Sequence, residues 1–315
     1  MQNCITFKTG MLDNIGDNME DTLVQKIISQ CIYGSCRGLF NKIDSIPYAL
    51  IKGEALSLQA YGSVGLRNYN DIDLLVPREY ITEVKSILAE EGFSPNITSK
   101  KDTILIQAYT HQLPPYYKKN NGRVLAVDVN HDIMWGEFVG KKINTIEFIS
   151  DTIETELYGV KVKILPPIKA LIQLILHVYK DMNSIYLIAT RKKFDPKMFQ
   201  DVFFLLSNNV GDISIERLFR FSSMYEIIPY VYYVLYYTEL VYESNMIKKY
   251  VDAFRTDEGV RLLDCYGLNT TERRAWKVNF YERMASNDLF SLIESDLNSQ
   301  DHKKIRINKS VFFDE

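Results

Sequence analysis

Segment 48–76 constrains the fold of this chain more than any other, because it places two carboxylates in an apolar run. Apart from one aspartate, residues 72–76 are apolar and predict a short buried strand. Side chains on a strand alternate between its faces, so Asp71 and Asp73 share one face and Ile72 takes the other. Aspartate is depleted in strands, and two like charges this close repel each other. A bound cation would offset this repulsion, and Mg²⁺ suits carboxylate oxygens. Taken alone, the pair is more typical of two solvated aspartates at the start of a strand, and the residues around it change that interpretation.

Residues suited to a polyphosphate precede the two aspartates. A predicted strand over residues 48–52 ends in Lys52-Gly53, and a predicted helix follows it. Glycine lets the backbone approach a phosphate closely, and the first amides of a helix favour an anion. Lys52 and Arg67 would neutralise the phosphates, Arg67 with two parallel hydrogen bonds. Each basic residue alone is typical of a solvated surface, so the inference depends on their order.

A second predicted strand, over residues 123–130, carries another aspartate. Leu125, Val127 and Val129 share one of its faces, and Asp128 lies on the other. An unpaired charge among apolar neighbours would be costly. Either a salt bridge to a nearby lysine or arginine or a bound cation would offset that cost.

The order Lys52-Gly53, Arg67, then Asp71-Ile72-Asp73-Leu-Leu-Val resembles the bacterial uncharacterised nucleotidyltransferase family of the DNA polymerase β-like superfamily. The resemblance implies an α/β (α+β) fold with a small mixed β-sheet and a C-terminal helical domain. It also implies a third carboxylate on a neighbouring strand, and Asp128 matches that position.

The chain departs from these families at two positions. Glu54 follows Gly53 where the wider superfamily usually has serine, and Asn130 stands where the narrower family often has histidine, with His131 next. His177, Lys193 and Asp201 match the narrower family loosely, but a core histidine and an ion pair between helices are the favoured explanation.

The periodicity of the remaining chain predicts a domain of residues 1–165 with an N-terminal helix, and a helical domain of residues 166–315 that begins at a Pro-Pro pair. One helix, or two helices broken near Gly34 or Gly38, is predicted at 20–43. Further predicted elements are helices at 78–91, 168–179 and 227–242, a strand at 103–109, and short strands or a hairpin within 141–165. The loop at 110–122, rich in aromatic and basic residues, either covers a nucleotide or is a solvated hairpin tip.

Composition excludes some classes of protein. The 315 residues have a net charge of −3 and are 46% hydrophobic, which suits about two domains. With a pI of about 5.9, the chain is not a general nucleic-acid binder. Its four cysteines lack the spacing of a zinc site, so free thiols in a cytoplasmic protein are expected. No signal peptide or membrane segment is apparent.

Together with the residues quoted above, the resemblance implies a metal-dependent nucleotidyltransferase that transfers AMP from ATP to a hydroxyl and releases pyrophosphate. Asp71, Asp73 and Asp128 would bind two Mg²⁺ ions and carry the catalysis, and Lys52, Gly53 and Arg67 would bind the nucleotide. A small molecule or a protein is expected as acceptor rather than a nucleic acid. The alternatives are an inactive nucleotide-binding or interaction protein, and an enzyme that attaches AMP to a partner in a toxin–antitoxin-like pair.

Overall fold

A computed structural model describes residues 19–67, 69, 71–95, 110–120, 122–135, 143–190 and 193–312. Contacts divide this described part into two compact units. The sheet unit comprises residues 18–173 and 208–213, and the helical unit comprises residues 174–207 and 214–315. The expected domain boundary at residue 166 stays a prediction, because a division by contacts does not show where an independently folding domain ends.

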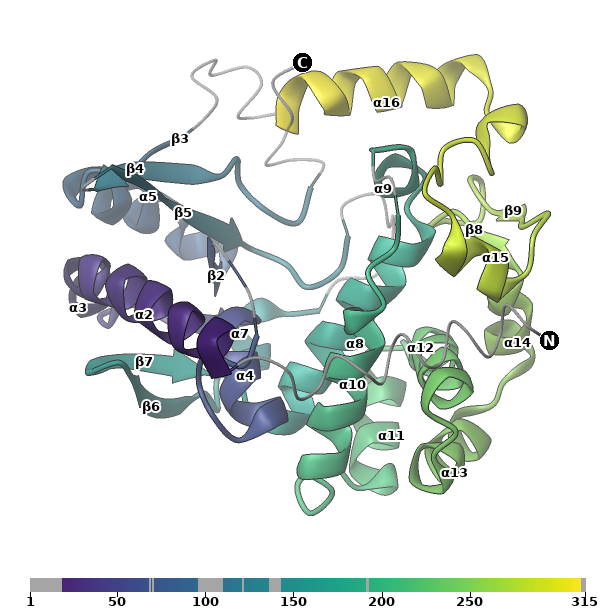
Figure 1. Ribbon diagram of the computed structural model, residues 1–315, viewed down its shortest axis with the longest axis horizontal. Coiled ribbons are helices and arrows are strands. Elements are labelled where there is room, and N and C mark those ends of the chain that lie inside the picture. The colour runs from purple at the N-terminus through teal and green to yellow at the C-terminus, as the bar shows by residue number, and fades with distance from the viewer. Residues whose placement is uncertain are drawn as a thin grey trace. The chain divides into compact units, whose positions relative to one another are not determined.

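The sheet unit is built on seven strands in the order β3-β4-β5-β2-β1-β7-β6 (Figure 1). Pairs β2–β5 and β1–β7 are parallel, and the other pairs are antiparallel. This mixed sheet with its helices confirms the predicted α/β class. The strands are β1 (Ala49–Ile51), β2 (Asp71–Leu75), β3 (Ser94–Pro95), β4 (Tyr116–Asn120), β5 (Arg123–Asn130), β6 (Ile153–Leu157) and β7 (Val160–Ile164).

The sheet unit also contains helices. They are α2 (Met19–Ser35), α3 (Arg37–Ile43), α4 (Gly53–Tyr61), the 3₁₀ turn η1 (Arg78–Tyr80), α5 (Ile81–Glu90) and α7 (Thr145–Phe148). Helices α2, α3 and α5 share one buried core with alternate residues of the strands. The helices contribute, among others, Leu39, Phe40, Val84 and Leu88, and the strands contribute Leu50, Ile72, Leu74, Val127, Val129 and Val162. Because strand side chains alternate, the residues between them, including the aspartates, face the other way.

Most predicted elements of this unit are found. The helix expected at 20–43 is two helices separated at Cys36, and the helix expected at 78–91 buries Ile81, Val84, Ile87 and Leu88 as predicted. Strands β6 and β7 form the predicted hairpin, whose turn holds Gly159 at φ 74°. The expectation of only strands at 141–165 is wrong for residues 145–148, which form the short helix α7. The Asn144 side chain caps this helix by accepting from the Glu147 amide at 3.3 Å.

The expectation of a loop over 110–122 is wrong for residues 116–120. These form β4, which pairs along its length with β5 and buries Tyr116. The strand-forming tyrosines outweigh the turn residues on either side. The strand expected at 103–109 lies outside the described residues.

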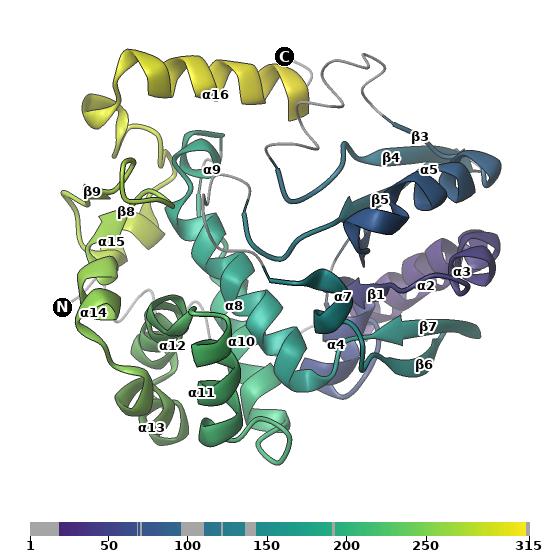
Figure 2. The ribbon, with the colours of Figure 1, turned by 180° about the vertical axis from the view of Figure 1, so that it is seen from behind.

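The helical unit surrounds α12, which is the predicted buried helix. Its elements are α9 (Ile185–Thr190), α10 (Lys197–Asn208), α11 (Ile215–Met224), α12 (Ile228–Tyr242), α13 (Asn245–Phe254), α14 (Asp257–Leu263), α15 (Phe280–Ala285), η2 (Glu294–Asp296), α16 (Ser299–Phe312) and the hairpin β8 (Cys265–Tyr266) and β9 (Arg274–Ala275). Helix α8 (Pro167–Asn183) contributes residues to both units. Figures 1 and 2 show α12 among its neighbouring helices. In the part of the chain described, no helix combines the length and apolarity that crossing a membrane requires.

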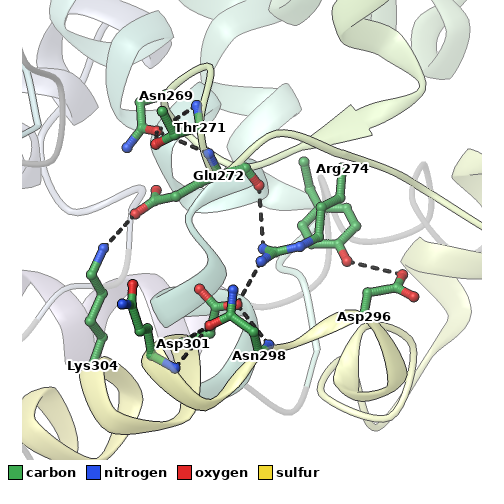
Figure 3. Close-up of polar contacts among 10 residues, drawn as sticks. Asn269, Thr271, Glu272, Arg274, Asp296, Asn298, Asp301 and Lys304 are labelled. Atoms are coloured by element: carbon green, nitrogen blue, oxygen red, sulfur yellow. Dashed lines mark hydrogen bonds and ion pairs between the residues drawn. The ribbon is translucent and has the colours of Figure 1, made fainter.

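Polar contacts attach the C-terminal α16 to the β8–β9 hairpin (Figure 3). The Arg274 guanidinium donates to Asp301 at 2.5 Å, and Lys304 donates to Glu272 at 2.9 Å. The side chains of Lys303, Lys304 and Arg306 are exposed.

Candidate active site

Three aspartates emerge from the same face of the sheet. In the parallel pair of β2 and β5, Asp73 is in register with Asp128, and Asp71 is in register with Ala126. Residues in register on adjacent strands point to the same face, and Asp71 lies two positions from Asp73 on its strand. Asp73 is 7% exposed, while Asp71 and Asp128 are half-buried. The structure thus brings together the three carboxylates that the sequence singled out.

The charges around Asp71 explain its titration. Burial, and then the negative charge of Asp73, raise the pKa of the Asp71 carboxyl, whereas the positive charges of Lys52 and Arg67 act in the opposite direction. A carboxylate pair of this kind is stabilised by any cation that approaches it. Both basic residues are near enough to influence Asp71, so the basic residues singled out by the sequence lie near these carboxylates.

Lys52 joins β1 to α4 in a strained backbone conformation. Its φ of 58° and ψ of −148° lie in a region that is essentially restricted to glycine. The side chain ends 3.0 Å from Asp73, with Nζ donating to Oδ1. Such strain costs on the order of 1–3 kcal/mol and is concentrated at functional sites. Here it directs the lysine toward the carboxylates.

Gly53 follows in the left-handed region, with φ of 44°. A Cβ at this position would meet only the Tyr69 ring, at an ordinary 3.6 Å. Backbone conformation therefore requires the glycine more than space does. Gly53 begins α4, so the first amides of that helix lie directly after Lys52.

Arg67 lies in the loop between α4 and β2. It is half-buried, and its neighbours in the loop are attached to α4 by hydrogen bonds from the amides of Gly65 and Leu66. Sequence reasoning missed the acceptor of the first bond, the carboxylate of Glu54. It is fully buried instead of facing the phosphate site. The tyrosines at 69 and 158, which also donate to it, gave no pattern in the sequence.

His131 is buried, and His177 belongs to the helical unit. His131 is 1% exposed, and burial together with the charges of Arg78 and Lys85 lowers its pKa to about 3. His177 belongs to the helical unit and pairs with Asp181 on its own helix, with Nε2 3.3 Å from Oδ2. Asp201 is buried in α10 of the same unit. A functional role for His177, Lys193 or Asp201 stays a prediction.

The donor chemistry of the site fits a hard divalent ion. Three carboxylates on one face are the ligands that Mg²⁺ prefers, and the charge repulsion at Asp71 would be relieved by it. As the side chains stand, no three His, Cys, Asp or Glu residues within the described ranges converge closely enough to hold an ion. Lys52 instead engages Asp73, so ion binding would require these side chains to turn toward one another.

Comparison with solved structures gives several similar chains. The solution structure of the antibiotic-resistance factor ANT(2'')-Ia is 15% identical over 65% of this chain and 94% of that one, with a TM-score of 0.36. The crystal structure of ANT(2'')-Ia in complex with adenylyl-2''-tobramycin is 13% identical over 66% and 98%, with a TM-score of 0.34. An antigenic nucleotidyltransferase-like protein from Paracoccidioides brasiliensis is 18% identical over 60% and 92%, with a TM-score of 0.30. These scores are too low to support an argument by themselves.

Comparison with curated proteins gives no match. The sequence model of a family described as "Uncharacterised nucleotidyltransferase" matches residues 29–243, which is more than half of the chain and includes every residue of the site described above. The chain therefore belongs to the uncharacterised nucleotidyltransferase family.

Proposed function

We propose that the protein transfers AMP from ATP to an acceptor hydroxyl, with Mg²⁺ as cofactor and pyrophosphate as the second product. Family membership supports nucleotidyl transfer as the type of reaction. The observation that carries the proposal is the register of β2 and β5, which puts Asp73 beside Asp128 on the face that also bears Asp71.

The proposed reaction is an in-line displacement. The acceptor oxygen forms a bond to the α-phosphorus of ATP, the bond from that phosphorus to the bridging oxygen breaks, and pyrophosphate leaves. Asp128 takes the proton of the acceptor hydroxyl. Asp71, Asp73 and Asp128 would hold Mg²⁺, which when bound neutralises charge on the attacking and leaving oxygens.

Lys52, Arg67 and the first amides of α4 would hold the phosphates. Phosphoryl transfer depends mainly on positioning and charge neutralisation, and these groups supply positive charge at one edge of the carboxylates. The guanidinium of Arg67 suits two phosphate oxygens at once. We propose a small molecule or a protein as acceptor, because the acidic chain disfavours a nucleic acid.

One observation favours a second candidate, a nucleotide-binding protein without turnover. The ammonium of Lys52 already neutralises Asp73 at 3.0 Å, and Glu54 replaces the serine usual in the wider superfamily. Such a protein would bind ATP and release no pyrophosphate with any acceptor.

Pyrophosphate release from ATP and Mg²⁺, measured with a panel of hydroxyl-bearing small molecules and proteins, tests the proposal. We expect Asp73→Asn to lower the rate on the order of 100-fold or more, as for loss of one electrostatic group in an active site. The exposed Asp252→Asn serves as the matched control and should react like the wild type. Equal rates for Asp73→Asn and wild type would exclude the transferase. ATP binding in calorimetry without pyrophosphate release would support the binding protein, and absence of ATP binding would exclude both.

A further inference from the structure

The carboxylate of Glu54 is buried beside the proposed phosphate site. Glu54 is in the first turn of α4, one residue after Gly53, and its side chain is 0% exposed. A buried carboxylate is costly unless several donors satisfy it. The groups that donate hydrogen bonds to this carboxylate therefore explain how it can be buried here.

Three donors converge on this carboxylate, and two of them come from the loop that carries Arg67. The Gly65 amide donates to Oε2 at 2.8 Å, and the Tyr69 hydroxyl donates to Oε1 at 3.2 Å. The third donor is the Tyr158 hydroxyl, at 2.9 Å from Oε1, in the turn between β6 and β7. Each carboxylate oxygen thus has a partner from the loop.

The two loop donors flank Arg67 symmetrically in the sequence, two residues before it and two after it. A second anchor from α4 lies between them, where the Leu66 amide donates to the Ser57 hydroxyl at 3.1 Å and that hydroxyl donates to the Ser63 carbonyl at 2.8 Å. The backbone around Arg67 is therefore held by side chains of α4. The charge of Arg67 in turn acts on Asp71.

We infer that Glu54 is a positioning residue, whose buried carboxylate holds the loop around Arg67 so that Arg67 faces the triphosphate. This inference rests on the proposed function, in which Arg67 binds phosphate. It explains why a negative charge is tolerated next to an anion site. The carboxylate is turned into the protein, where it accepts hydrogen bonds from the loop and does not face the ligand.

The test combines Glu54→Gln with Arg67→Ala, using inorganic tripolyphosphate with Mg²⁺, and ATP, as probes in calorimetry. We expect Glu54→Gln alone to weaken tripolyphosphate binding about tenfold, which is the effect of losing a hydrogen bond to a charged acceptor. In the Arg67→Ala background the same substitution should add nothing, because the group on which it acts is gone. Tyr158→Phe removes a donor outside the loop and should bind like the wild type.

Loop anchoring has its own readout, which is hydrogen exchange of the amides at residues 63–67. Glu54→Gln should raise exchange at Gly65 and Leu66 whether or not phosphate is present. If that variant fails to fold, Tyr69→Phe keeps the carboxylate and removes one loop donor, with the same expected direction in both measurements.

The outcomes separate the two hypotheses. Additive losses in the double variant, or unchanged affinity in Glu54→Gln, would overturn the positioning role. A different outcome is faster exchange in Glu54→Gln while the wild-type protein binds neither probe. That result would overturn the proposed function and, with it, the phosphate-directed role of the loop.

Discussion

In the proposed function, Lys52 would couple the carboxylates to the phosphate site. Its ammonium pairs with Asp73 at 3.0 Å and acts on Asp71, so in the structure it stands where a metal ion would add positive charge. A divalent ion bound by the carboxylates would release Lys52 for the phosphates. Removing the positive charge of Lys52 should therefore raise the affinity for a metal ion and lower the affinity for the nucleotide.

We expect Lys52→Met to bind Mn²⁺ more tightly and tripolyphosphate more weakly than the wild type. Removing an opposite charge leaves the carboxylates uncompensated, and such a charge is worth about one pKa unit or more, so Mn²⁺ affinity should rise about tenfold. Calorimetry with Mn²⁺ alone measures this. Lys42→Met, which removes a lysine paired with Glu90 and Glu91 away from the site, is the control. Unchanged Mn²⁺ affinity in Lys52→Met would refute the coupling.

His131 makes the stability of the sheet unit sensitive to acid. Its pKa is lowered to about 3 by burial and by the charges of Arg78 and Lys85, whereas in the unfolded chain it is about 6.5. Between these values the unfolded state takes up the proton and the folded state does not. The stability that neutral His131 allows is therefore complete above about pH 6.5 and is lost as the pH falls toward 3, by about 1.4 kcal/mol per pH unit at most.

The difference between wild type and His131→Leu isolates this effect from that of other groups. Urea midpoints at pH 7, 6, 5 and 4 should fall less steeply for His131→Leu, which has no group to protonate. Parallel midpoint curves for the two proteins would show that His131 is not responsible.

At the scale of elements, the turn from β1 into α4 depends on positive φ at Gly53, and the end of α4 depends on it at Gly62. Their φ values are 44° and 73°, and a Cβ at Gly62 would meet nothing within 4 Å. We expect Gly53→Ala and Gly62→Ala each to lose about 1 kcal/mol of stability. Only Gly53→Ala should also weaken ATP binding, because only it moves the amides next to Lys52. Equal ATP affinity for both variants would separate this turn from the site.

The elements of the site could be predicted because their patterns are local. Alternation along β2 and β5 put Asp71, Asp73 and Asp128 on faces opposite to the apolar residues, and the register then set Asp73 beside Asp128. Strand β4 was missed because its pairing with β5 is not visible in its own residues, which begin just after a Pro-Pro pair. The buried hydrogen bonds of Glu54 could not be predicted for the same reason, because the donors Gly65, Tyr69 and Tyr158 are not adjacent to it in the sequence.

At the scale of the whole molecule, a family pattern placed the site but left the last third of the chain without a role. The family match ends at residue 243, and the β8–β9 hairpin and α13 to α16 follow it. Helical periodicity predicts helices there and does not say which surfaces meet. Ion pairs between α16 and the hairpin join residues about 30 positions apart, which no local pattern reports.

Those ion pairs give a prediction about how the two units depend on each other. Asp301 is 6% exposed and accepts from Arg274, whereas the Lys304 side chain, which pairs with Glu272, is largely exposed (Figure 3). Arg274→Met leaves a buried carboxylate without that partner and should cost about 3 kcal/mol. Lys304→Met breaks only an exposed pair and should cost less than about 1 kcal/mol.

Thermal unfolding and limited proteolysis together locate the effect. We expect Arg274→Met to lower the unfolding midpoint and to make residues 299–312 accessible to protease, while ATP affinity stays that of the wild type, because the site residues all belong to the sheet unit. Lys304→Met, as the matched control, should leave both measurements nearly unchanged. If ATP affinity falls together with the stability in Arg274→Met, the helical unit supports the nucleotide site, and the separation of function between the two units is wrong.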